Sequence, residues 1–115
     1  MSRSDPVIRS KYLVDQAKRH VQDLERLIRD MDIAALELDQ LIRTEEERTG
    51  IRDHKHPQYS TFAKSAAERR GKLATSIDAL QETLAAAMRE RDRAIEEFNR
   101  DRDQAQSLSE RESTT

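Results

Sequence analysis

The chain has 115 residues, of which 38% are charged and 3% aromatic, and its net charge is −2 from 21 basic and 23 acidic side chains. Because the signs are mixed, no strongly basic surface exists and no nucleic-acid partner is expected. Cysteine is absent, which excludes disulfides and thiolate metal sites and fits a reducing compartment. No apolar run is long enough for a signal peptide or a membrane span, so we expect a cytoplasmic protein without direct membrane insertion.

The first predicted helix covers residues 6–49. Asp5 or Ser4 can cap its free amides, and Pro6 suits the first helical position because its missing N–H would have no partner there. Gly50 can take the left-handed conformation that ends a helix. At ~1.5 Å per residue, such a helix is roughly 65 Å long.

Along this helix, apolar residues recur at alternating steps of three and four residues without a break. An average step of about 3.5 residues is the repeat of a helix that supercoils around a partner helix. The pattern therefore predicts one strand of a coiled coil. Its seam consists of Val14, Ala17, Val21, Leu24, Ile28, Met31, Ala35, Leu38 and Ile42.

Residues 50–60 lose this period and hold a Gly, a Pro and short polar residues, so they are predicted to form a connecting loop. Ser60 or Thr61 then caps a second helix, predicted over residues 61–104. Residues 105–115 are polar and are predicted to form a frayed or disordered tail.

The seam of the second helix is weaker, because two of its positions are arginine. A second apolar line lies beside it in the distal half, so the apolar stripe widens there. The seam positions are Ala63, Ala66, Arg70, Leu73, Ile77, Leu80, Leu84, Ala87, Arg91, Ala94 and Phe98, and the second line is Leu84, Met88 and Ile95.

Two long helices joined by a short loop pack antiparallel, so the predicted fold class is all-α, a long two-helix antiparallel coiled-coil hairpin over residues 1–104. Two registers fit the heptads. One sets Ile28 opposite Leu80, and the other sets Ile28 opposite Ala87 and Glu45 opposite Arg70. We favour the first, which places the midpoint of the hairpin inside the loop.

A hairpin of this kind buries one seam only, so its own stability should be modest. We expect it to gain stability from a partner or from weak self-association. The two arginines of the second seam, Arg70 and Arg91, are interpreted as stems that lie along the apolar stripe with their charged ends in water. Alternatively, they break self-pairing and set the register.

Neither catalysis nor metal binding is indicated by the candidate polar clusters. Asp53, His54 and His56 carry metal-ligand chemistry, but no further ligand is visible, so a solvated turn is the favoured interpretation and no metal or cofactor is predicted. The carboxylates at 45–47 are interpreted as a solvated helix end, because a helical hairpin offers no partly dry site to shift their pKa values. We predict no catalytic residue and no enzyme.

Half of the four aromatic residues, Tyr59 and Phe62, lie at the loop end. They either form a small apolar plug that keeps the tip closed or present a docking surface for a partner. The sequence gives these two interpretations equal weight.

From the end of the first predicted helix into the second, the chain carries a distinctive set of residues: Glu45, Glu46, Glu47, Arg48, Thr49, Gly50, Ile51, Asp53, His56, Tyr59, Thr61, Phe62, Ala63, Lys64, Ala66, Ala67, Arg69 and Arg70. In these residues the chain resembles the flagellar export protein FliJ family in its alphaproteobacterial form. The overall length and the helix–loop–helix plan match as well. The chain departs from the family in the loop, where His54 follows Asp53 and Pro57 follows His56, whereas the family carries Pro after the Asp and an aromatic after the His.

This resemblance implies a coiled coil similar to the stalk of rotary ATPases, with a role in flagellum biogenesis, motility and chemotaxis. Its implied partners are the hexameric export ATPase of the flagellar type III secretion apparatus, the export gate protein in the membrane and the chaperones of late substrates. Its implied location is cytoplasmic, peripheral at the inner face of the plasma membrane near the flagellar base.

By the same similarity, we expect the free helix ends, around residues 7–17 and 94–101, to face the ATPase and the tip to face the gate. The residues expected at the ATPase end are Val7, Val14, Ala94, Ile95 and Phe98, and those expected at the tip are Ile51, Tyr59 and Phe62.

Two other functions remain open on the sequence alone. One is a structural homo-oligomeric coiled-coil scaffold that pairs through Leu84, Met88 and Ile95. The other is a substrate-escort chaperone whose apolar face holds exported subunits.

Overall fold

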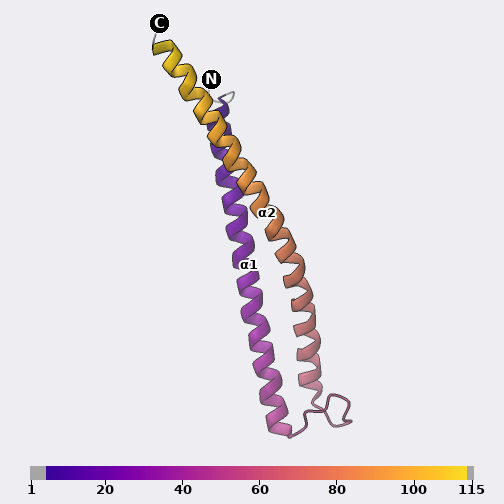
Figure 1. Ribbon diagram of the computed structural model, residues 1–115. Helices are drawn as coiled ribbons and strands as arrows, with labels where there is room; N and C mark the ends of the chain where they lie inside the picture. The colour runs from indigo at the N-terminus through magenta and orange to yellow at the C-terminus, as the bar shows by residue number, and fades with distance from the viewer. Residues whose placement is uncertain (1–4, 114–115) are drawn as a thin grey trace. The chain divides into compact units, whose positions relative to one another are not determined.

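A computed structural model describes residues 5–113, which form two helices and one loop (Figure 1). Helix α1 covers Pro6–Thr49 and helix α2 covers Thr61–Ser113. Within the described residues the chain contains no strand. The two long helices pack against each other, which confirms the predicted all-α, coiled-coil-like helical hairpin. Ser4, the alternative cap, and residues 114–115 of the predicted tail lie outside the described residues.

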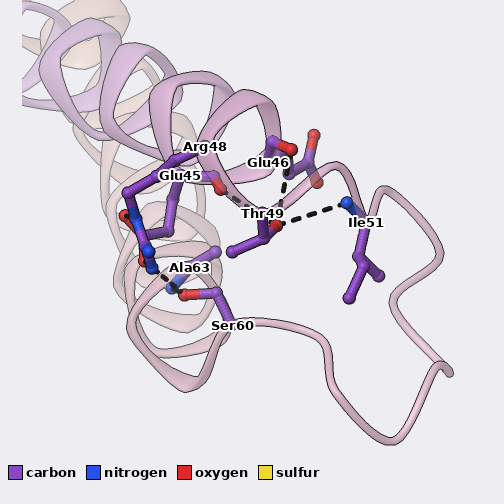
Figure 2. Close-up of polar contacts among 7 residues, drawn as sticks. All are labelled: Glu45, Glu46, Arg48, Thr49, Ile51, Ser60 and Ala63. Atoms are coloured by element: carbon purple, nitrogen blue, oxygen red, sulfur yellow. Dashed lines mark hydrogen bonds and ion pairs between the residues drawn. The ribbon is translucent and has the colours of Figure 1, made fainter.

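The ends of both helices are set by local hydrogen bonds. Asp5 Oδ1 accepts from the Val7 amide at 2.9 Å, and it thereby satisfies one of the free donors at the start of α1. Gly50 has a φ of 72° and closes α1. Ser60 Oγ accepts from the Ala63 amide at 3.1 Å and so caps α2 (Figure 2).

Contacts divide the chain into two units, and residues 26–82 form the first, here called the loop unit. In it, parts of α1 and α2 run antiparallel on either side of the loop (Figure 1). Its tightest packing is at Ala63 and Ala66, which are both 0% exposed. Arg70 Nε donates to Asp39 Oδ1 at 3.0 Å, which joins α2 to α1.

This ion pair distinguishes the two predicted registers. The favoured register sets Asp39 opposite Arg69, the chain neighbour of the observed partner Arg70. The alternative, which sets Glu45 opposite Arg70, is wrong because Asp39 occupies that place. Arg70 therefore contributes an ion pair between the helices and is not only a stem with its charged end in water.

The described residues before 26 and after 82 form the second unit, here called the end unit. There the start of α1 and the distal part of α2 run antiparallel (Figure 1). Ser10 is only 5% exposed, and its hydroxyl contacts the carboxylate of Asp101 across the two helices. Its Oγ also lies 2.7 Å from the carbonyl oxygen of Pro6.

The residues of the predicted seam lie inside the helix pair. Every member of the series from Val14 to Ile42 is buried or half-buried. In α2, Ile77 is buried, and Leu73, Leu80 and Leu84 are half-buried. Burial of one continuous stripe on each helix is how two amphipathic helices stabilise each other in water.

Helix α2 extends beyond its predicted end at residue 104, so the predicted frayed or disordered tail is corrected for residues 105–113. No Gly or Pro follows Gly71, and the segment is rich in residues that favour helix. All residues from 102 to 113 are exposed, including Leu108 at 53%.

Neither helix, within the part of the chain that the structure describes, contains an apolar stretch long enough to cross a membrane.

Candidate functional site

The loop brings Tyr59 back onto the end of α1. Tyr59 is 8% exposed, and its hydroxyl donates to Glu46 Oε2 at 2.7 Å. This bond to a carboxylate stabilises the protonated phenol and, with burial, raises the pKa of Tyr59 to about 12. The His54 ring stacks on Tyr59 with centroids 4.8 Å apart, and its Nε2 lies 3.4 Å from the same Glu46 oxygen.

A second contact between α1 and the start of α2 is made by Glu45 (Figure 2). Ser60 Oγ donates to Glu45 Oε1 at 2.9 Å, and Arg48 Nη2 donates to the same oxygen at 2.6 Å. The bonds from Arg48 and then Ser60 lower the pKa of Glu45, and Glu45 in turn raises the pKa of the Arg48 guanidinium.

The interpretation of residues 45–47 as a solvated helix end is therefore corrected for Glu45 and Glu46. Both face the returning loop, and each accepts a hydrogen bond from the segment just before α2. Glu47 is exposed, in keeping with a solvated position. The loop closure that these two carboxylates support is local structure rather than acid–base chemistry.

The three predicted tip residues differ in exposure. Tyr59 is buried, Ile51 is half-buried and Phe62 is 55% exposed. Of the two interpretations of the aromatic pair, Tyr59 fits the plug and Phe62 fits a docking surface. The exposed apolar surface of the tip is therefore centred on Phe62.

The polar residues of the loop serve its turns. Asp53 Oδ1 accepts from the Lys55 amide at 3.0 Å, and His56 Nδ1 accepts from the Gln58 amide at 3.0 Å. Within residues 5–113, no group of three or more His, Cys, Asp or Glu side chains is arranged to hold a metal ion.

At the opposite end, four of the residues expected to meet the ATPase are half-buried and one, Val14, is buried. The Arg102 guanidinium lies 5.7 Å from the centre of the Phe98 ring, in a cation–π contact. The apolar side chains most exposed in the end unit are instead Tyr12 at 57%, and Ile8 and Leu108 at 53% each. The half-buried residues expected at this end are Val7, Ala94, Ile95 and Phe98.

A groove of about 630 Å³ lies between the two helices of the end unit. Ala17, Ala94 and Leu13 supply its apolar lining, and charged side chains of both signs, among them Arg19 and Arg93, also line it. The alanines are too short to fill the space between the helices, which leaves the groove open. A shallow, open groove of this kind suits contact with another protein better than enclosure of a small substrate.

The contact between Ser10 and Asp101 was not predicted, although the spacing of both residues indicates seam positions. Ser10 lies three residues after Val7 and four before Val14, which is a seam position, and Asp101 lies three residues after Phe98. The polar pair therefore continues both seams by one position beyond their predicted ends.

Comparison with known proteins gives no match to a family model, to a curated protein or to a solved structure.

Proposed function

We propose that this chain is a non-enzymatic stalk and adaptor of the flagellar type III protein export apparatus. In this role it promotes assembly and activity of the hexameric export ATPase and links the ATPase to the export gate and to late-substrate chaperones. It acts in the cytoplasm at the inner face of the plasma membrane near the flagellar base. Its mechanism is differential binding to states of the ATPase ring, not chemistry by its own side chains.

The proposal is supported mainly by the position in the fold of the residues that resemble the FliJ family. The resemblance to the FliJ family is densest over residues 45–70, and this stretch supplies the contacts that close the hairpin. Glu46 binds Tyr59, and Gly50 adopts the positive φ that ends α1. A match concentrated on such specific positions supports kinship more strongly than shared coiled-coil composition does.

Two surfaces are assigned to the two main partners. The groove of the end unit, with Ile8 and Tyr12 exposed in the same unit, is assigned to the ATPase. Its mixed charges suit contacts that form and break as ring subunits change state. The exposed ring of Phe62 is assigned to the export gate protein, because exposed aromatics are frequent anchors of protein interfaces.

Addition of the wild-type chain to the purified export ATPase should increase hexamer formation and ATP turnover. The double variant Arg19→Glu, Arg93→Glu reverses two charges of the groove and should lose most of this increase. Arg29→Glu with Arg69→Glu reverses two exposed arginines on the same helices outside the groove, and this control should keep the increase. Failure of the wild-type chain to change ring assembly or turnover would reject the proposed function.

Binding to the gate protein should weaken about tenfold when Phe62 is replaced with Ala, which corresponds to ~1.4 kcal/mol. Tyr59 is left unchanged in this experiment because it is buried and holds the loop. Leu108→Ala is the matched control, because it removes a similarly exposed apolar side chain, 53% against 55%, from the same helix. Equal gate affinity of the Phe62→Ala variant and the wild-type chain would contradict the tip assignment.

The two alternative functions have unequal support. The scaffold that pairs through Leu84, Met88 and Ile95 would need these side chains at the surface, but all three are half-buried. The escort chaperone is favoured by one observation, the exposed pair Ile8 and Tyr12, which lie one helical turn apart on α1.

A further inference from the structure

The loop unit has a groove of its own, with a volume of about 460 Å³. It lies between α1 and α2, and its apolar lining comes from Ala35, Leu36, Ala74 and Ile77. Leu36 is the most exposed large apolar side chain of the described residues, at 66%. Covering this exposed leucine and the apolar lining of the groove would therefore be energetically favourable.

Beside the α2 residues that line this groove, small side chains occupy three successive positions of the helical repeat. Ala67, Gly71 and Ala74 follow one another at steps of four and three residues, so they share one face of the helix. A Cβ atom added at Gly71 would meet no atom within 4 Å, so the space beside it is open. A second helix can therefore approach the backbone of α2 closely along this face.

Three charged side chains also line this groove, Asp32 of α1 and Arg70 and Asp78 of α2. Arg70 and Asp78 lie four residues before and four residues after Ala74. Arg70 uses its Nε on Asp39, which leaves both Nη groups for another acceptor, and Asp78 is exposed and makes no ion pair within the described residues. If α2 meets a second, antiparallel α2 with Ala74 opposite Ala74, Arg70 of each copy stands opposite Asp78 of the other.

We propose that this face is an interface between two copies of the chain, related by a twofold axis that passes beside Ala74. Such an interface is isologous, so each favourable pair occurs twice. The ion pair of Asp39 with Arg70 sets Leu36 level with Leu73, close to this axis. Leu36 of each copy therefore covers the small residues of the other, and the four helix segments form a local four-helix bundle.

Charge complementarity favours a second copy over a helix with charges of one sign. A basic helix would satisfy Asp78 but would repel Arg70, whereas this chain carries the required acid and base at equal distances from Ala74. The inference is independent of the export role, because it rests on the loop unit alone.

Single cysteines test the axis directly, because the native chain has none. Ala74→Cys places two thiols opposite each other at the axis, and mild oxidation should convert most of that variant into a disulfide-linked dimer. Ala79→Cys is the matched control, since it is the same substitution at an exposed position on a different side of α2, and it should stay largely unlinked. Linkage of Ala79→Cys as fast as that of Ala74→Cys would overturn the proposal.

Light scattering after size-exclusion chromatography gives the second measurement. The wild-type chain should approach twice its 13.4 kDa mass as its concentration rises. Ala74→Glu sets two carboxylates against each other at the axis and should weaken dimerisation at least tenfold without loss of helical circular dichroism, whereas Ala79→Glu should dimerise as the wild-type chain does. A wild-type chain that stays monomeric at every concentration, or an Ala74→Glu variant that dimerises normally, would also overturn it.

Discussion

Replacing Ala66 with Leu should lower the free energy of unfolding by about 1 to 3 kcal/mol, the usual range for a side chain forced into a filled core. Ala66 is 0% exposed in the loop unit, so the three added carbon atoms have no free volume to enter. The two helices must move apart or the leucine must adopt a strained rotamer. Urea unfolding followed by circular dichroism measures the loss.

The matched control is Ala79→Leu, the same substitution at an exposed position of α2. Its effect should stay within about 0.5 kcal/mol, because no neighbour is displaced and leucine is nearly as good a helix former as alanine. Both variants must be compared at one protein concentration, because the proposed dimerisation would add to apparent stability. Equal stability of the Ala66→Leu variant and the wild-type chain would show that the helices are not in contact at this position.

The stability of the wild-type chain should fall as the pH rises from about 10 to about 12, and part of this fall should be absent from a Tyr59→Phe variant. The folded state raises the pKa of Tyr59 from 10.0 to about 12, because Glu46 accepts a bond from the protonated phenol. A raised pKa means that the stabilisation is complete below the unfolded value and is lost as the pH passes through the folded value.

At neutral pH, the Tyr59→Phe variant should be less stable than the wild-type chain by about 1.5 kcal/mol, a typical value for a hydrogen bond to a charged group. Its ring still fills the site and stacks on His54, so the loss reports the hydroxyl alone. The same urea unfolding experiment, repeated across the alkaline range, gives both the neutral loss and its decline.

The pKa itself is accessible because the chain has two tyrosines, Tyr12 and Tyr59. In a Tyr12→Phe variant, the ultraviolet absorbance of tyrosinate reports Tyr59 alone. Ionisation of Tyr59 near its ordinary pKa of 10.0 would contradict the bond to Glu46 and the plug that it forms.

The features that sequence predicted well depend on neighbours along the chain. Asp5 and Pro6 start α1, and Gly50 ends it, through bonds that span a few residues. The seam needs only a repeat of about 3.5 residues to be recognised, and a short loop between two such seams leads to antiparallel packing. Fold class therefore follows from local chemistry and periodicity.

The features that sequence missed depend on contacts between distant segments. From the sequence, Tyr59 and Phe62 fitted a plug and a docking surface equally well. The path of the loop, which the sequence does not reveal, buries Tyr59 against Glu46 and leaves Phe62 exposed. In the loop unit, the ion pair of Arg70 with Asp39 lies one residue from the favoured register, and in the end unit the contact of Ser10 with Asp101 lies three residues from it. Helix α2 is longer than predicted because the polar residues at its end still have sufficient helix propensity.

The buried contact between Ser10 and Asp101 has a consequence for how the helices of the end unit are aligned. If one helix slid past the other by a heptad, apolar layers would still meet apolar layers, but Asp101 would come to rest against Ala17 and Ser10 against Leu108. A half-buried carboxylate would then lose its donor and face a methyl group, at a cost in desolvation. This polar contact therefore selects one axial alignment of two helices whose apolar repeats alone would allow several.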